Sequence, residues 1–331
     1  MSAAYGLYGH IRSNRTRSAI LIVGLFFLVY LLVFAFTLAI NGLMIGDQDI
    51  DVILSRTVWQ FLWLFPFATL ATALWALAGF RFHQWMIDRS TGARDVTREE
   101  EPDLYNLLEN LCISRGIAMP KLQVIETDVM NAYASGMNDS QYRIAVTRGL
   151  MQALDRDELE AVLAHELTHI RNGDVRLMVV AVVIAGIITL VGELFFRSLR
   201  HMRVPASSSG GNRKGGGGGL IAILLALVII AIAWFLSLVI RFALSRSREY
   251  LADAGSVELT KNPDAMIRAL RKIEGKSEMP NVPSGIMEMC IDNKRNTFAD
   301  LFATHPSIER RVAKLVEVAG GQDAQSPVTQ S

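Results

Sequence analysis

Two histidines and a glutamate near the middle of the chain have the types and the spacing of a metal centre that could hydrolyse a bond. They lie in the stretch AHELTHIRNGD, residues 164–174. On an α-helix, residues four apart share one face, so His165 and His169 can hold one ion together. Glu166 is rotated off that face, which lets its carboxylate reach a metal-bound water without binding the metal. Because Zn²⁺ lowers the pKa of bound water towards ~7, Glu166 could take a proton and deliver it to a leaving amine.

A third metal ligand can come from the stretch SRSREYLADAGSVEL, residues 245–259. A catalytic zinc needs three protein ligands and one open position, and two histidines with a carboxylate favour zinc. Glu249 is the candidate third ligand. Asp253 lies four residues later on the same helical face and can accept a hydrogen bond from the second ring nitrogen of a ligating histidine. Each stretch alone could be an ordinary charged helix, but together they predict one Zn²⁺ per chain.

The elements that must position these residues include four apolar runs, each long enough to cross a bilayer as a helix of about 20 residues. They are residues 18–40, 57–80, 177–196 and 219–240. A buried core helix is the alternative for any one run, but a chain that is 51% apolar and 20% charged favours a multi-pass membrane protein. The first run is longer than the ~7–15 apolar residues of a secretory signal, so we expect it to remain as an anchor.

Basic residues flanking the runs predict the orientation, because they collect on the cytoplasmic side. Arginines precede the first run and follow the second, whereas the loop between these runs is mainly acidic. We therefore expect the N-terminus and residues 81–176 to be cytoplasmic. The loop 197–218 is also basic and disagrees with this rule if the last two runs cross fully, and its Ser and Gly tracts predict a flexible segment.

The polar segments predict a small α+β domain. Leucines at helical spacing favour a helix over 101–117, a strand follows near 121–127, and residues 129–146 read as two strands around a turn at 138–140, so we expect a meander. We expect Asp155 to be the N-cap of the next helix, with Glu158 completing a capping box, and Gly173 to end that helix. Further helices are expected at 245–256, 263–275 and 306–318, with a linker near 279–288.

The fold predicted from these patterns is a predominantly α-helical multi-pass membrane protein with four apolar spans and a cytoplasmic α+β domain carrying a small β-sheet. We expect an N-terminal membrane anchor at 1–80, a first cytoplasmic segment at 81–176, a membrane hairpin at 177–240, a second cytoplasmic segment at 241–320 and a disordered tail at 321–331.

The charge balance and the cysteines exclude some classes of function. The net charge is +1, which gives no sign of a nucleic-acid partner. Cys112 and Cys290 lie far apart without a CxxC spacing, so we expect free, buried thiols in a reducing compartment and no zinc ligand among them.

The combination of motifs resembles the membrane metalloproteases of peptidase family M48, and most closely the HtpX type. It consists of HELTHIRNGD, a hydrophobic hairpin, REYLADAGS and ATHPSIERRV at 303–312. The resemblance implies the gluzincin fold, zinc held by His165, His169 and Glu249, Glu166 as the base, and Asp253 behind a ligand. It also implies a multi-pass endopeptidase of the bacterial inner membrane that clears damaged or misfolded membrane proteins. The Gly-rich stretch 206–219 departs from the family pattern.

Two further stretches match the same family. NAYASG at 131–136 resembles an edge strand over the catalytic cleft, where a peptide could add by backbone hydrogen bonds at Asn131 and Ala132. The alternative is a plain hairpin. His305 and Arg311 match the family's HPxxxxR pattern, and His305 could stabilise an oxyanion. Equally, His-Pro could simply begin the last helix, with Pro306 in its first turn.

The first hypothesis is a zinc endopeptidase that lies in the membrane and acts on unfolded or membrane proteins from the cytoplasmic side. A second is a membrane protein whose metal is structural, without catalysis. Glu166 argues against the second, because a purely structural site has no use for an acid there. A third is a protease that processes prenylated proteins after a CAAX cysteine, which the two-plus-two arrangement of spans disfavours.

Overall fold

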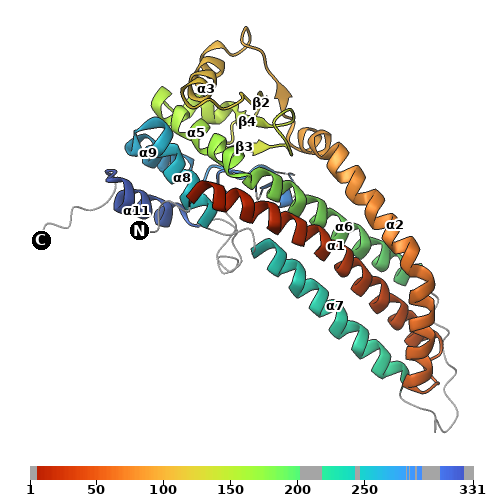
Figure 1. Cartoon of the computed structure of the whole chain (residues 1–331). Helices are drawn as coiled ribbons and strands as arrows, with labels where there is room; N and C mark the ends of the chain where they lie inside the picture. The colour runs from red at the N-terminus through yellow and green to blue at the C-terminus, as the bar shows by residue number, and fades with distance from the viewer. Residues whose placement is uncertain are drawn as a thin grey trace, which may run out of the picture. The chain divides into compact units, whose positions relative to one another are not determined.

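The computed structural model describes residues 6–201, 218–242, 247–280, 282, 284–287, 289–292 and 306–323. It divides into two compact units that are each formed by several stretches of the chain (Figure 1). Unit 1 comprises Met1–Ser18, Arg81–Val182 and Phe242–Ser331, and unit 2 comprises Ala19–Phe80 and Val183–Arg241. The predicted division into segments is not tested by this partition and stays a prediction.

Four long helices supply unit 2: α1 (Gly6–Met44), α2 (Ile50–Thr91), α6 (Asp174–His201) and α7 (Gly218–Phe242). Among the described residues, three stretches are long and apolar enough to cross a membrane. They are Ser18–Met44, Ile50–Thr91 and Gly218–Leu236. The remaining predicted span, 177–196, lies within α6 and stays a prediction.

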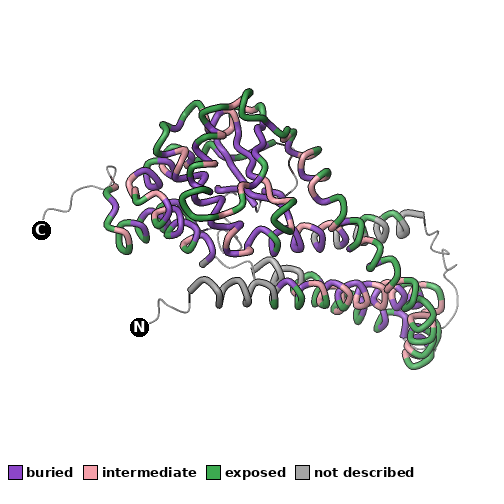
Figure 2. Tube along the Cα trace, turned by 45° about the horizontal axis from the view of Figure 1, so that its top comes forward, coloured by how far each residue is buried: buried purple, intermediate pink, exposed green. Residues whose placement is uncertain are grey.

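Small residues let α1 and α7 approach closely inside unit 2. A Cβ added to Gly42 of α1 would stand 3.0 Å from the Gly219 carbonyl oxygen, and the Gly219 N–H donates to the carbonyl of Gly46, just after α1, at 3.2 Å. Leu38, Ile53 and Ala222 pack into one buried cluster beside this contact. Figure 2 shows that many residues of these helices are exposed, and a large share of them are apolar. Exposed side chains of α2 include Trp59, Leu62, Trp63, Phe67, Leu70, Leu74 and Leu77. Such a surface suits hydrocarbon rather than water.

The small predicted sheet is present in unit 1, but its topology differs from the expected meander. Its strands are β1 (Arg94–Asp95), β2 (Lys121–Ile125), β3 (Ala132–Ser135) and β4 (Arg143–Thr147), in the order β1-β2-β4-β3. The β2 strand pairs with β4 in parallel, and β3 pairs with β4 antiparallel. The prediction of a meander was wrong, because β4 lies between β2 and β3 and so places β3 at the edge of the sheet. The buried residues of β3 are accommodated there because its outer side is covered by the antiparallel bridge from Tyr133 to Cys290.

Helix α5 (Arg156–Asn172) carries the two histidines and has the predicted ends. The Asp155 carboxylate accepts from the Glu158 N–H at 3.0 Å, and the Glu158 carboxylate accepts from the Asp155 N–H at 3.0 Å, so the capping box is confirmed. Gly173 closes the helix in the left-handed conformation with φ 73°. A new helix, α6, then begins at Asp174, so the chain turns at Gly173.

Helices surround the sheet and α5 in unit 1 (Figure 1). They are α3 (Pro102–Arg115), α4 (Arg148–Ala153), α8 (Ser247–Thr260), α9 (Pro263–Ile273), α10 (Ser284–Met287) and α11 (Ile308–Ala319). The predicted helices near 101–117, 245–256, 263–275 and 306–318 are thereby confirmed. Of the expected disordered tail, Asp323 pairs with Arg271 at 2.7 Å, whereas residues 324–331 lie outside the described part.

The contact between α5 and α8 brings the two motif-bearing stretches together. The hydroxyl of Ser256 donates to the Ala161 carbonyl at 2.6 Å. Gly255 lies so close to Thr168 that an added Cβ would stand 2.3 Å from its methyl carbon. Because no side chain separates the helices at Gly255, their backbones can approach closely. This packing carries Glu249, near the start of α8, towards His165 and His169.

Candidate active site

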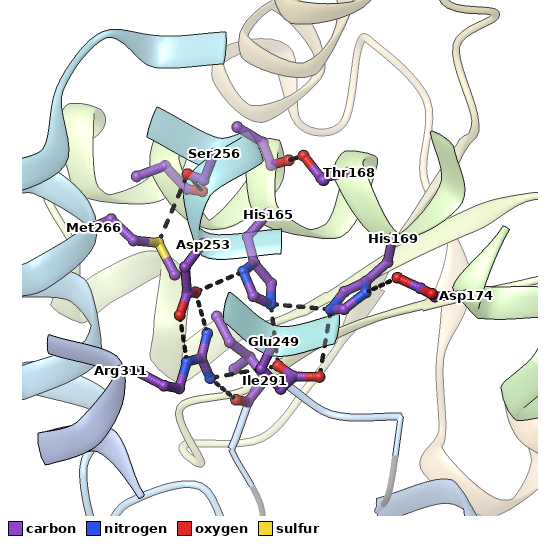
Figure 3. A network of polar contacts seen from close by, with 12 residues as sticks. His165, Thr168, His169, Asp174, Glu249, Asp253, Ser256, Met266, Ile291 and Arg311 are labelled. Atoms are coloured by element: carbon purple, nitrogen blue, oxygen red, sulfur yellow. Dashed lines mark hydrogen bonds and ion pairs between the residues drawn. The ribbon is translucent and has the colours of Figure 1, made fainter. Parts of the chain in front are cut away.

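Three buried side chains converge on one point in unit 1, His165 and His169 from α5 and Glu249 from α8 (Figure 3). The Nε2 atoms of the two histidines are 3.2 Å apart. Glu249 brings one carboxylate oxygen to 3.6 Å from His165 Nε2 and the other to 3.7 Å from His169 Nε2. The structure therefore brings together the three residues that the sequence predicted as metal ligands.

The spacing of these atoms fits a metal ion. With metal–ligand bonds of ~2.0–2.1 Å at tetrahedral angles, neighbouring ligand atoms lie about 3.3–3.5 Å apart. The separations of 3.2, 3.6 and 3.7 Å come close to that figure. Burial alone would lower the pKa of His169, but Glu249 and Asp174 raise it to about 10. The carboxylates thus favour a positive charge at this point, which a divalent ion supplies.

Glu166 lies beside this cluster with both carboxylate oxygens buried and without a hydrogen-bond partner in the described part of the chain. The side chain is 1% exposed. Burial raises the pKa of Glu166, against the opposing effect of the two histidines. An orphaned buried carboxylate is costly, so such groups call for a functional explanation. A proton acceptor for a reacting water is one.

Asp253 lies behind His165, where the sequence analysis expected it. One of its oxygens is 3.0 Å from His165 Nδ1, which fixes the ring so that Nε2 faces the cluster. The guanidinium of Arg311 binds the same carboxylate through Nε at 2.9 Å and Nη2 at 2.5 Å. Burial pushes the pKa of Asp253 upward, but Arg311 more than offsets this and leaves it below its usual range.

The match to the family's HPxxxxR pattern made Arg311 a candidate for binding the substrate or an oxyanion, but its side chain is buried behind the metal cluster. It is only 1% exposed, and its Nη1 donates to the Ile291 carbonyl at 2.7 Å. Its guanidinium is engaged with Asp253 and Ile291 inside the protein, as Figure 3 shows. The geometry favours a role in holding Asp253 rather than in binding substrate.

Asp174 is a residue of the site that the sequence analysis did not name. Its carboxylate lies 3.0 Å from His169 Nδ1 and so holds the second histidine as Asp253 holds the first. The signal was present in the quoted motif, since Gly173 ends α5 in a left-handed turn that returns the next residue towards His169. A carboxylate directly after such a turn is a candidate partner for a histidine in the last helical turn.

The polar groups of Asn131 and Ala132 form hydrogen bonds with other residues of the protein. The Asn131 side chain donates to the carbonyls of Ser277 at 2.7 Å and Asp292 at 3.3 Å. The Ala132 N–H donates to the Asn131 side chain at 2.9 Å, and the Ala132 carbonyl accepts from the Ile291 N–H at 2.9 Å. β3 is an edge strand within the sheet, but its first residue already has partners on the outer side.

The remaining candidate, His305, lies outside the described residues. Pro306 precedes the N-cap Ser307 of α11, so it is not in the first helical turn as one reading proposed.

The two cysteines are free and buried, as predicted. Burial raises the pKa of Cys112 to about 11 and also raises that of Cys290. Neither thiol belongs to the cluster of His165, His169 and Glu249.

A helix with two histidines four residues apart, an adjacent glutamate and a glutamate from a second helix defines a metallopeptidase site. Comparison with known proteins agrees. The model of peptidase family M48 matches residues 98–319, and the chain belongs to this family. With its apolar helices, it is a membrane metalloprotease.

The relatives are similar over nearly their whole length. A protein of Bacteroides fragilis named "Protease HtpX homolog" is 37% identical over 311 residues, which cover 91% of this chain and 95% of the relative. A protein of the same name from Listeria monocytogenes is 35% identical over 318 residues, with 93% and 99% covered. The crystal structure of S. mikatae Ste24p gives a TM-score of 0.43 at 20% identity, over 77% of this chain and 58% of that one.

Proposed function

We propose that this protein is a zinc-dependent endopeptidase of the bacterial inner membrane that cleaves misfolded or unfolded proteins on the cytoplasmic side. The observation that carries the proposal is the convergence of His165, His169 and Glu249 beside the unpartnered carboxylate of Glu166. In the proposed site, the first three residues hold one zinc. When bound, zinc would act as a Lewis acid on the scissile carbonyl and lower the pKa of a water.

The chain's own residues divide the remaining work. Glu166 accepts a proton from the attacking water at a carboxylate oxygen, then donates it to the nitrogen of the leaving amine. Asp253 and Asp174 hold the Nδ1 atoms of the two histidines and keep both Nε2 atoms directed to one point. Arg311 balances the buried charge of Asp253. These contacts preorganise the site before substrate binds.

A peptide substrate that pairs with β3 would have to displace a segment of the protein itself. The Thr147 N–H donates to the Asn131 carbonyl at 3.0 Å, so alternate residues of β3 face β4. The backbone groups of Ala132 and Ala134 therefore point to the outer edge. That edge is already covered, because Tyr133 forms an antiparallel bridge with Cys290 and the Ile291 N–H donates to the Ala132 carbonyl. Pairing through backbone groups after displacement of this segment would support a broad choice of sequences and hence unfolded proteins as substrates.

The packing of the site supports an even number of membrane crossings between α5 and α8. α5 precedes and α8 follows the helices α6 and α7, and both contribute to one buried cluster. The chain must therefore cross the membrane an even number of times between them. Because α7 is a candidate span, we propose that α6 supplies the second crossing and completes four spans. The basic residues that flank the first two spans support a cytoplasmic site.

The test compares proteolysis and metal content in the detergent-purified full chain. Wild type should cleave casein, an unfolded protein, and contain about one zinc per chain. Glu166→Gln should retain the zinc and lose the cleavage, whereas Glu160→Gln, elsewhere on α5, should behave as wild type. Cleavage by Glu166→Gln at the wild-type rate would contradict the assignment of the base. If wild type and Glu166→Gln both retain zinc and neither of them cleaves casein, the metal is structural.

A further inference from the structure

Unit 1 contains a cavity of about 660 Å³ that is separate from the metal cluster. Its lining comes from the start of the first span, the loop before β2, the β3–β4 turn and the junction of α5 with α6. The lining residues are Ser18, Ile117, Ala118, Met137, Asn138, Asp139, Ser140, Tyr142, Ile170, Arg171, Gly173 and Arg176. The volume falls in the range of roughly 300–1,000 Å³ that is typical of small-ligand sites.

The polar groups of this cavity suit an anion. Arg171 and Arg176 contribute two guanidinium groups, and Asp139 is the one acid in the lining. Arg171 is only loosely engaged, at 3.7 Å from Glu258, and no ion pair of Arg176 occurs within the described residues. The buried hydroxyl of Ser18 has no hydrogen-bond partner in the described part of the protein. Two arginines with a free hydroxyl match the oxygens of a phosphate.

The cavity also lies where the chain changes from polar to apolar. Ser18 is the first residue of the first candidate span. Arg176 directly precedes the apolar run LMVVAVVIAG of α6. Lipid headgroups occupy this boundary in a bilayer, and basic pockets beside membrane helices bind acidic headgroups. Ile117, Met137 and Ile170 add an apolar wall beside the arginines, which suits a ligand with a charged end and an apolar body.

We propose that this cavity binds the headgroup of an anionic phospholipid, with Arg171 and Arg176 on its phosphodiester. The bound lipid would hold the junction of α5 and α6 at the membrane surface, four residues beyond His169. This site is independent of the proposed proteolytic mechanism, since none of the residues assigned to the metal or to the proton transfer lines the cavity.

The test measures which lipids stay bound to the full chain. Detergent-purified protein is equilibrated with equal amounts of phosphatidylglycerol and phosphatidylcholine, and the retained lipids are counted by native mass spectrometry. We expect wild type to retain phosphatidylglycerol at least about tenfold more than phosphatidylcholine, given two arginines at the site. Arg171→Gln combined with Arg176→Gln should reduce this ratio to about one. Arg176→Lys keeps the charge and should retain most of the preference.

Arg89→Gln is the matched control, because Arg89 is an exposed arginine near the end of α2 that does not line the cavity. An equal loss of preference in this variant would mean general surface attraction and would overturn the proposal. Displacement of the lipid by millimolar inorganic phosphate would assign the cavity to free phosphate instead. Displacement by a casein peptide would assign it to polypeptide. Equal retention of both lipids by wild type would also refute the proposal.

Discussion

The pairing of Asp253 with Arg311 gives a prediction that separates metal binding from folding. Both side chains are buried and joined by two hydrogen bonds of 2.9 and 2.5 Å, and Asp253 also holds His165 Nδ1 at 3.0 Å. Arg311→Met leaves the buried Asp253 carboxylate without its cation, and Asp253→Leu leaves the buried guanidinium with only the more distant Glu249 carboxylate, at 3.7 Å. The double variant replaces both charges by apolar side chains of comparable size.

These variants should affect the free energy of unfolding and the affinity for zinc differently. Either single substitution should lower the free energy of unfolding by about 3–5 kcal/mol, because it leaves one buried charge uncompensated. The double variant should recover most of this loss, apart from about 1–3 kcal/mol for the Ile291 carbonyl that loses its donor. Zinc affinity should not recover, because His165 Nδ1 still lacks its acceptor. Losing such a contact costs about 10–100-fold in metal affinity.

The assay combines thermal unfolding of the metal-free chain with competition for zinc against a chelator of known affinity. We expect the double variant to unfold close to the wild-type temperature and to bind zinc as weakly as Asp253→Leu. If the double variant regained both properties, Asp253 would have no role in orienting His165. If it remained as unstable as the singles, the two side chains would not act as a pair.

Three further predictions concern the elements that carry the site. Asp155→Ala removes the acceptor of the capping box and should cost about 1 kcal/mol of unfolding free energy, seen as a lower melting temperature. Gly255→Ala places a methyl 2.3 Å from the Thr168 methyl carbon, so it should cost about 1–3 kcal/mol and weaken zinc binding in equilibrium dialysis; unchanged binding would mean that the helix spacing is not critical. Because burial raises the pKa of Glu166 and a base acts only when deprotonated, kcat/KM should fall as pH decreases, with a midpoint above the ordinary carboxyl value of about 4.3; a midpoint at that value would contradict the buried environment.

Local signals in the sequence were sufficient to predict the helix that carries the histidines. The capping box at Asp155 and the stop at Gly173 depend on neighbouring residues alone, and the four-residue spacing of His165 and His169 acts within one helix. These inferences need only the geometry of one helix. Glu249 was a candidate third ligand from the pattern of its own helix, whereas its approach to the histidines depends on the contact between α5 and α8.

Features that depend on contacts between distant segments were not predictable in the same way. The parallel pairing of β2 with β4 leaves β3 at the edge of the sheet although all four of its residues are buried, and the periodicity of the sequence does not specify this strand order. Arg311 binds Asp253, which lies 58 residues earlier in the chain. Its buried position could therefore not be inferred from the neighbouring residues of its own segment. The occupation of Ala132 by Ile291 likewise joins segments far apart in the chain.

Zinc-edge X-ray absorption of the purified full chain tests whether His165, His169 and Glu249 hold one zinc ion. We expect imidazole nitrogen and oxygen ligands at about 2.0–2.2 Å, without sulfur. Substitution of Glu249 by Gln should change the oxygen shell and reduce bound zinc, while Glu258→Gln, an exposed residue later on α8, should not. A sulfur shell at about 2.3 Å, or an unchanged spectrum in Glu249→Gln, would contradict this assignment of the ligands.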